Sequence, residues 1–319
     1  MYDSVLLNDW HVVANASDLK EGKPMAARLL EEDIVLWRAG ENIHAWRDLC
    51  AHRGTRLSLG RIENCRLLCP YHGWEYDETG QCVRFPAHPN QIPPAKAHAQ
   101  VYVAQQRYGW IWVSLGQPKH DPPVMPEWHD TSFRKVPCGP YGIKANGPRI
   151  IENFLDVTHF PYVHAGLLGD PEHAELSDYS VETTENGLVA KDIFIWQPDP
   201  DGTGQGAYVN YTYKVFRPLT AYFIKNTGGR FAIFFTVTPV QETYSQAWMY
   251  VAMDYSELPD EQVQLFQDEI IKQDIPIVES QRPELLPLDL AAELHLRSDR
   301  TAIAYRKWLK ELGLTVGTV

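Results

Sequence analysis

Two short motifs in the first quarter of the chain each place one cysteine close to one histidine. The first is Cys50-Ala-His52 and the second is Cys69-Pro-Tyr-His72, with sixteen residues between His52 and Cys69. Together the motifs offer two thiolates and two imidazoles, which are side chains that bind transition metals. The chain must therefore fold so that two loops meet around one metal centre.

Two kinds of centre use two cysteines and two histidines. A structural zinc site usually pairs its ligands by kind, with cysteine near cysteine and histidine near histidine. Here each motif holds one of each, as in a Rieske [2Fe–2S] cluster, where one iron takes both cysteines and the other takes both histidines. Gly54 and Gly73 suit tight loops in which the backbone comes close to sulfur. The sequence favours a Rieske cluster over zinc, with these four side chains as its ligands.

The two loops also indicate how the cluster is reduced. They resemble the Rieske loops of respiratory chains, but those loops carry an additional cysteine each, joined as a disulfide. Thr55 and Tyr71 stand at the matching positions here. This difference favours the lower-potential type of cluster, which takes electrons from a separate reductase or ferredoxin.

Length and charge limit the possible classes. A chain of 319 residues fits two domains. Its 29 basic and 41 acidic side chains give a net charge of −12, which argues against a nucleic-acid partner. No run of eighteen apolar residues occurs, and the first residues lack the basic and apolar segments of a signal peptide. We expect a cytoplasmic protein that is not inserted in a membrane.

The N-terminal part is predicted to be a small antiparallel β domain. Short apolar stretches such as 34–37 and 108–113 alternate with turns, and the cysteine–histidine motifs fall between them. The proline-rich stretch 116–126 is the best linker candidate. We place the Rieske domain at residues 1–117 and a catalytic domain at residues 118–319.

The second part mixes strands with helices, which predicts an α+β fold with a helix laid on one sheet. Strands rich in β-branched and aromatic residues are expected at 208–215, 221–226, 231–240 and 246–254. Helices are expected at 149–164, at 257–280, and from Ser298 or Asp299 to a glycine stop at Gly313.

A second metal site is predicted in the first of these helices. Asn153, Asp156 and His159 are three residues apart, so they share one side of a helix. His164 follows His159 by five residues, an angle of about 140° on an unbroken helix, but Pro161 between them permits a kink that brings the imidazoles together. Two core histidines would be the purely structural explanation. Beside a Rieske cluster, we interpret His159 and His164 as metal ligands.

A third ligand is needed, because a facial triad on Fe(II) has two histidines and one carboxylate. In the predicted helix 257–280, Asp274 is the one charge on a largely apolar stripe, and a buried carboxylate is costly unless it is paired or bound to a metal. We predict Asp274 as the ligand, with Glu279 as the fallback. The stripe consists of Val263, Phe266, Ile270, Asp274, Ile277 and Gln281.

The order of these segments resembles that of the Rieske non-haem iron oxygenases over nearly the whole chain. The segments are 50–72, 153–164 and 273–283. The resemblance is to the group with one type of oxygenase subunit, which includes vanillate-type and dicamba-type O-demethylases, caffeine-type N-demethylases and saxitoxin-pathway hydroxylases. The overall pattern looks most like the last of these, although that likeness implies no substrate.

The resemblance implies a Rieske domain followed by a catalytic domain with a curved antiparallel sheet and flanking helices. It also implies a homotrimer, because in the family the cluster and the iron of one subunit are too far apart for efficient electron transfer. Asp156 would then link His72 of one subunit to His159 of the next. A carboxylate bonded to both imidazoles fixes their tautomers.

The function implied is that of a terminal oxygenase, which uses O2 and reductase-derived electrons at a mononuclear Fe(II) to hydroxylate or demethylate a small organic substrate. Arene cis-dihydroxylation stays open, because it uses the same iron. A Rieske electron carrier without oxygenase activity is a further alternative. Strand aromatics could line a substrate pocket or belong to the core: Phe223, Phe231, Phe234, Phe235 and Trp248.

Overall fold

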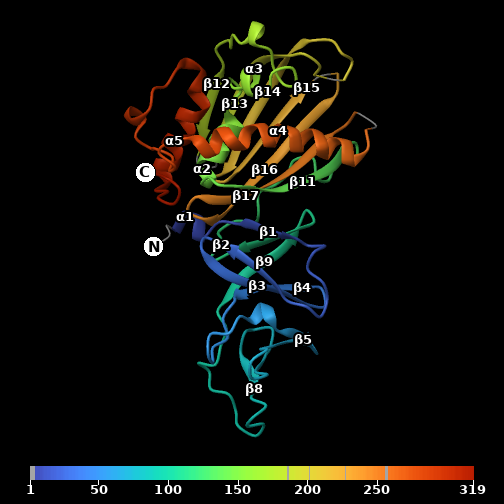
Figure 1. The fold of residues 1–319 in the computed structure, drawn as a ribbon, viewed down its shortest axis with the longest axis vertical. Helices are drawn as coiled ribbons and strands as arrows, with labels where there is room; N and C mark the ends of the chain where they lie inside the picture. The colour runs from blue at the N-terminus through green and yellow to red at the C-terminus, as the bar shows by residue number, and fades with distance from the viewer. Residues whose placement is uncertain (1–3, 185–186, 201, 227, 256–257) are drawn as a thin grey trace. The chain divides into compact units, whose positions relative to one another are not determined.

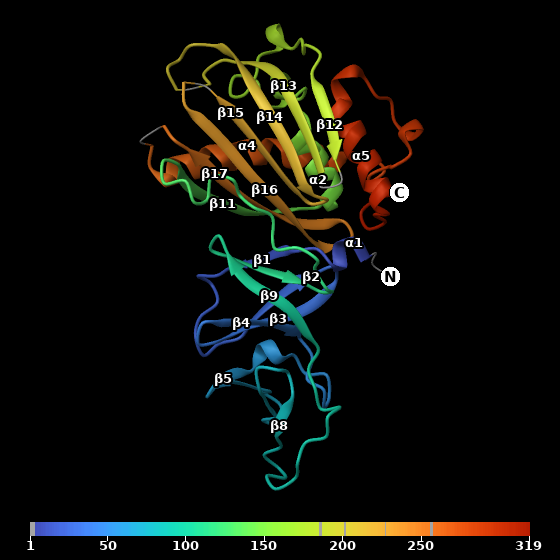
Figure 2. The same ribbon diagram turned by 180° about the vertical axis from the view of Figure 1, so that it is seen from behind.

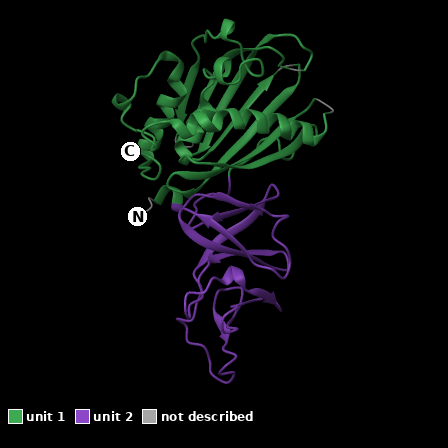
Figure 3. Ribbon diagram, viewed as in Figure 1, with its two compact units in different colours: residues 1–6, 123–319 green, residues 7–122 purple. Residues whose placement is uncertain are grey.

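The computed structural model describes residues 4–184, 187–200, 202–226, 228–255 and 258–319. The chain divides into two compact units, one of residues 7–122 and the other of residues 1–6 and 123–319 (Figure 3). Each unit has its own sheets.

The unit of residues 7–122 is an antiparallel β structure, as the sequence predicts. One sheet has the strand order β1-β10-β9-β4-β3-β2, and a second has the order β5-β6-β7-β8 (Figure 1). The strands are β1 (His11–Asn15), β2 (Met25–Leu29), β3 (Glu32–Ala39), β4 (Asn42–Arg47), β5 (Arg61–Glu63), β6 (Arg66–Leu68), β7 (Glu75–Tyr76), β8 (Cys82–Arg84), β9 (Val101–Arg107) and β10 (Trp110–Ser114).

A buried aromatic core supports the two metal-binding loops of this unit. Trp37 and Trp46 meet edge to face with ring centroids 5.0 Å apart, and Trp46 meets Tyr76 in the same way at 6.3 Å. Cys50 and Cys69 belong to the same buried cluster. Edge-to-face aromatic pairs add to the stability gained by burial, so the cysteines sit on a rigid base.

The larger unit contains one antiparallel sheet of seven strands in the order β11-β17-β16-β15-β14-β13-β12. The four predicted strands are confirmed as β14 to β17, and the three strands β11 to β13 are additional. The strands are β11 (Arg134–Ile143), β12 (Ser180–Thr184), β13 (Gly187–Gln197), β14 (Ala207–Arg217), β15 (Thr220–Asn226), β16 (Arg230–Gln241) and β17 (Tyr244–Met253).

Helices cover one face of this sheet, and the α+β prediction is confirmed. Figure 1 shows α4 (Asp260–Ser280) crossing in front of the strands, and Figure 2 shows the strands in front and α4 behind them. The helix α5 (Arg300–Leu312) packs against β12 and β13 and ends at Gly313, whose φ of 77° is left-handed. No helix in the described ranges is long and apolar enough to cross a membrane.

The predicted continuous helix at 149–164 is wrong. The helix α2 (Gly147–Leu155) ends with Asp156 as its C-cap, and a separate short helix α3 (Phe160–Val163) begins after a turn. Pro161 stands in the first turn of α3, where its missing N–H has no partner to lose. The break places His159 just before α3 and His164 just after it.

Candidate active site

Two loops bring the four predicted cluster residues together. Cys50 and His52 follow β4, whereas Cys69 and His72 lie between β6 and β7. The Cys50 and Cys69 thiols hydrogen-bond to each other, and the Nδ1 atoms of His52 and His72 are 3.1 Å apart. The two loops therefore form one pair of sulfurs and one pair of ring nitrogens, which are the two ligand pairs that a Rieske cluster requires.

Backbone geometry holds both loops tightly. Gly54 donates its N–H to the Cys50 carbonyl, and Gly73 donates to the Cys69 carbonyl in the same way. Both glycines have positive φ, 71° and 68°. An L-residue at either position would be strained, which explains the glycine four residues after each cysteine.

The sulfur of Cys50 also has a hydrogen-bond partner in the buried Tyr76. Its hydroxyl lies 3.1 Å from Cys50 Sγ and also accepts the Ala51 N–H. The bond to Cys69, with smaller contributions from Tyr76 and backbone N–H groups, lowers the pKa of Cys50 to about 5. The same bond raises the pKa of Cys69, so Cys50 is the one of the two that is held as the thiolate, which is the form that binds iron.

The two histidines lie at the rim of this site. His52 is half-buried and stacks on Trp74 with ring centroids 4.4 Å apart and planes inclined by 8°. His72 is exposed. Because the two Nδ1 atoms face each other, the Nε2 atoms are the ring nitrogens left for other contacts.

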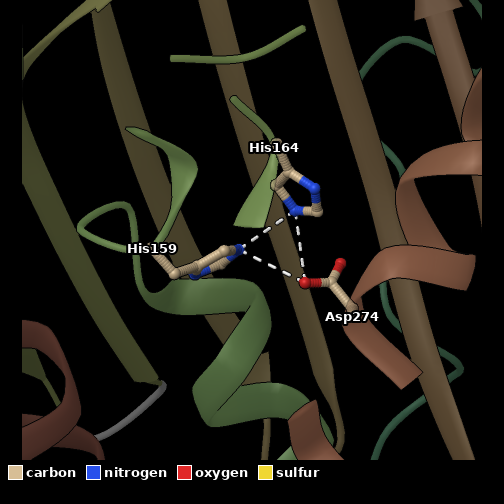
Figure 4. A group of neighbouring side chains, drawn as sticks. All are labelled: His159, His164 and Asp274. Carbon is tan, nitrogen blue, oxygen red and sulfur yellow. Dashed lines mark hydrogen bonds and ion pairs between the residues drawn. The ribbon is translucent and has the colours of Figure 1, made fainter. Parts of the chain in front are cut away.

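The second group of ligand atoms lies in the larger unit (Figure 4). His159 Nε2 and His164 Nε2 are 3.2 Å apart, and Asp274 Oδ1 lies 3.4 Å from the former and 3.2 Å from the latter. The structure thus brings together all three residues predicted from the sequence, and they form a group able to hold a metal ion. Such spacings match ligand atoms that each lie about 2.1 Å from one ion.

Hydrogen bonds outside the triad determine which nitrogens face inward. His164 Nδ1 lies 2.8 Å from Gln273 Oε1, which can only accept, so Nδ1 carries the proton. His159 Nδ1 faces Asp156 Oδ2 at 3.4 Å. Both Nε2 lone pairs then point at a carboxylate oxygen. When both imidazoles are neutral, the two Nε2 atoms and the carboxylate oxygen are three acceptors that face one another, which is the donor set of a 2-His-1-carboxylate iron site.

The triad is well enclosed. The side chain of His164 is 1% exposed, and those of His159 and Asp274 are each 13% exposed. Burial opposes the charged form of His159, but the carboxylates of Asp156 and Asp274 outweigh burial and raise its pKa to about 9. A cation is therefore favoured at this place, whether it is a proton or a metal ion.

Asp274 comes from α4, as predicted, although the predicted stripe is only partly correct. Val263 and Ile270 are buried, but Phe266 and Ile277 are 42% and 45% exposed. The buried face instead adds Gln267, Ile271 and Val278. The fallback Glu279 lies elsewhere and accepts the Lys144 N–H.

Asp156 lies next to His159 of the triad and is partly exposed to solvent. One carboxylate oxygen accepts the backbone N–H and hydroxyl of Thr158, and the other faces His159. Burial raises the pKa of Asp156, but the bonds from His159 and Thr158 lower it below its usual value overall. Its side chain still exposes 38% of its surface, which leaves room for a further partner.

A cavity of about 430 Å³ opens onto the triad. Phe223, Phe231 and Phe235 contribute to its walls, whereas Phe234 and Trp248 do not line it. Phe154 stacks on Phe235 with ring centroids 4.6 Å apart. This volume and these flat walls suit a small planar molecule.

Sequence reasoning missed four polar residues near the two sites. Tyr76 and Gln273 support cluster and triad ligands, and Gln197 and Lys225 line the cavity. Lys225 was detectable, because it is a lone charge in the otherwise uncharged stretch 220–226.

Comparison with known proteins places both units in one family. Residues 9–105 match the model of the Rieske [2Fe-2S] domain, and residues 143–315 match the vanillate O-demethylase oxygenase C-terminal domain. Methylxanthine N1-demethylase NdmA of Pseudomonas putida is 33% identical over 313 residues, 95% of this chain and 88% of that protein. The chain is a Rieske non-haem iron oxygenase.

Solved structures agree with this assignment. The structure of NdmA with caffeine superimposes with a TM-score of 0.86 at 31% identity, covering 97% of this chain and 91% of that one. Dicamba monooxygenase, at 22% identity and a TM-score of 0.80, shares the fold. The expected special likeness to saxitoxin-pathway hydroxylases stays a prediction.

The cofactors of this Rieske oxygenase are a [2Fe–2S] cluster and a mononuclear iron, as predicted. The enzyme is an O2-using oxidoreductase. The two cysteines and two histidines of the loops fit the cluster, and the three side chains of the triad fit the mononuclear iron.

Proposed function

We propose that this Rieske oxygenase removes a methyl group from nitrogen or oxygen of a small planar substrate. The observation that carries the proposal is the triad of two inward-facing imidazoles and one carboxylate at the wall of an aromatic cavity. NdmA is named as a methylxanthine demethylase, and its structure holds caffeine, a flat N-methylated molecule.

The ligands we propose are those predicted from the sequence. Cys50, Cys69, His52 and His72 hold the cluster. His159, His164 and Asp274 hold Fe(II). When bound, these groups supply single electrons and O2 activation, so that one oxygen atom enters a methyl C–H bond and the other leaves as water.

The remaining steps depend on the chain's own residues. Gln273 fixes the tautomer of His164, and Asp156 fixes that of His159. The aromatic walls hold the substrate flat and keep water from the reacting methyl group. The hydroxymethyl product then breaks its bond to nitrogen or oxygen and releases formaldehyde.

We further propose that the working enzyme is a homotrimer. Asp156 would accept a hydrogen bond from His72 of the partner subunit, and this contact would carry electrons toward His159. The partly exposed Asp156 carboxylate and the exposed His72 ring support the proposal.

A separate reductase or ferredoxin supplies the electrons, and the cytoplasm is the compartment we expect. Residues 1–117 and 118–319 would be the functional domains.

Product analysis tests this function. The iron-loaded enzyme with a surrogate reductase, NADH and O2 is offered N-methyl heterocycles and aryl methyl ethers, and formaldehyde and product mass are followed together. We expect equal amounts of formaldehyde and of a product lighter by one CH2. A gain of one oxygen atom without formaldehyde would show hydroxylation instead, and a gain of two oxygen and two hydrogen atoms would show cis-dihydroxylation.

A further inference from the structure

A buried lysine lies in the wall of the substrate cavity. Lys225 is in β15, opposite Tyr211 in β14 and Phe231 in β16. Its side chain is 7% exposed, and it lines the same cavity as the iron triad. A buried ammonium group is costly unless other groups compensate its charge.

Gln197 is the hydrogen-bond partner of this lysine. Lys225 Nζ donates to Gln197 Oε1 at 2.8 Å, and Gln197 Nε2 donates to the Tyr211 hydroxyl at 2.9 Å and to the Leu168 carbonyl at 3.3 Å. This orientation of the amide is fixed at both ends, because the lysine can only donate and the carbonyl can only accept. The Tyr211 hydroxyl accepts from Gln197, so its own proton is available to another acceptor.

Among the residues that the structure describes, no carboxylate bonds to this lysine. Within the described part of the chain, its contacts are the bond to Gln197 and the ring faces of Tyr211 at 5.7 Å and Phe231 at 5.1 Å. Asp199 also lines the cavity, but it is exposed and accepts the Gly204 N–H. Burial lowers the pKa of Lys225 to about 8, which leaves the amine mainly charged at neutral pH.

We propose that Lys225 and Tyr211, oriented by Gln197, form an anion-binding subsite, and that the substrate is a planar aromatic compound bearing a carboxylate. The ammonium has two N–H groups left after its bond to Gln197, and the tyrosine supplies one O–H. These donors match a carboxylate, which has two acceptor oxygens and one negative charge. The inference rests on the proposed demethylation and narrows its substrate class.

The rest of the cavity determines the shape of the bound molecule. Phe223 lies on the same face of β15, two residues before Lys225, and its ring centroid is 5.2 Å from that of Tyr211. Phe154 stacks against Phe223 at 5.6 Å. These rings contact one another and form one aromatic wall, against which a flat ring can lie with its carboxylate at Lys225 and its methyl group toward the triad.

Binding of matched ligand pairs tests the subsite. The iron-loaded enzyme is titrated calorimetrically with 4-methoxybenzoate and with the neutral 4-methoxybenzamide. We expect the wild type to prefer the acid by at least about 10-fold, which is the effect of one hydrogen bond to a charged group. Lys225→Met should weaken acid binding by about 10- to 100-fold and change amide binding by less than about 3-fold.

Lys191→Met is the control, because Lys191 is an exposed lysine on β13. It should leave both affinities unchanged. Lys225→Arg, which keeps the charge, should retain part of the preference for the acid. The wild-type comparison is decisive even if the methionine variant does not fold. Equal affinity for acid and amide, or no measurable binding of the acid, would overturn the proposal.

Activity separates this inference from the proposed function. Demethylation of neutral methylxanthines, together with equal affinity for the acid and the amide, would support demethylation and contradict the subsite. Charge-selective binding without formaldehyde from any methylated acid would support the subsite and contradict demethylation. If both proposals hold, Lys225→Met raises the KM for 4-methoxybenzoate much more than it lowers kcat.

Discussion

The two metal-binding regions of this chain are constructed in different ways. The proposed cluster residues come from two short loops within 23 residues, Cys50 to His72, and their histidines reach the surface. The triad combines two histidines around α3 with Asp274 of α4, 110 residues after His164, and is well enclosed. A surface site suits electron entry, whereas an enclosed site protects oxygen chemistry from water.

The two sites also differ in the interactions that keep their residues in place. Local backbone bonds through Gly54 and Gly73 shape the cluster loops. The triad depends instead on α4 packing against the sheet and on α2. Substitution of a ligand should therefore remove one cofactor and leave the other, and the predictions below test that separation.

Replacement of Asp274 should have the largest effect. Asp274→Ala removes the only carboxylate of the triad, so we expect the iron content to fall from three to two per chain and turnover to fall to background. The visible absorbance of the cluster should stay unchanged. Glu261→Ala, in the exposed first turn of the same helix, is the control and should behave like the wild type. Loss of the cluster in the Asp274 variant would contradict the claim that the two sites bind their cofactors independently.

The reciprocal change is His72→Ala. Loss of one imidazole should abolish the cluster absorbance and reductase-dependent turnover, while one iron per chain remains at the triad. Iron analysis and absorbance measure the two effects independently. His88→Ala, an exposed histidine in the same unit, should keep three irons. A His72 variant that retains the cluster spectrum would contradict its assignment as a ligand.

Asp156→Asn should have an intermediate effect. Both cofactors remain, but the carboxylate that orients His159 is lost, and we expect turnover to fall by about 10- to 100-fold. Single-turnover kinetics with a pre-reduced cluster would show a slow oxidation of the cluster. Asp192→Asn, at an exposed position with a positive φ that asparagine tolerates, is a matched control. Full activity of the Asp156 variant would remove this residue from electron transfer.

The smallest effect is expected at Tyr76. Its hydroxyl bonds to Cys50 Sγ, and with a cluster on that sulfur this bond would stabilise the more negative, reduced form. Tyr76→Phe should lower the cluster potential by about 40 mV, the equivalent of a hydrogen bond of about 1 kcal/mol. Tyr71→Phe, at an exposed tyrosine of the second cluster loop, should leave the potential unchanged. A redox titration with an unshifted midpoint for Tyr76→Phe would show that this bond does not tune the cluster.

Sequence patterns predicted the short-range features well. The cysteine–histidine motifs and the stop of α5 at Gly313 depend on neighbouring residues, and the structure has them as expected. The break after Leu155 was missed, because Asp156 ends α2 through side-chain bonds to Thr158 that helical periodicity does not reveal.

Hydrogen bonds between residues far apart in the chain could not be predicted from the sequence. Gln273 could be placed beside Asp274, but its bond to His164 spans 109 positions. The Lys225–Gln197 bond joins β15 to β13, which are not neighbours in the sheet. Such pairs follow from tertiary packing, and one sequence without its fold contains no periodic signal for them.

Anomalous diffraction at the iron edge tests the central claim most directly. A crystal of the wild-type enzyme, grown anaerobically with ferrous iron, should show two irons at the Cys50/Cys69 loops. A third iron should lie about 2.1 Å from each of His159 Nε2, His164 Nε2 and Asp274 Oδ1. Anomalous signal at the cluster alone, with none among the three ligands, would contradict the account.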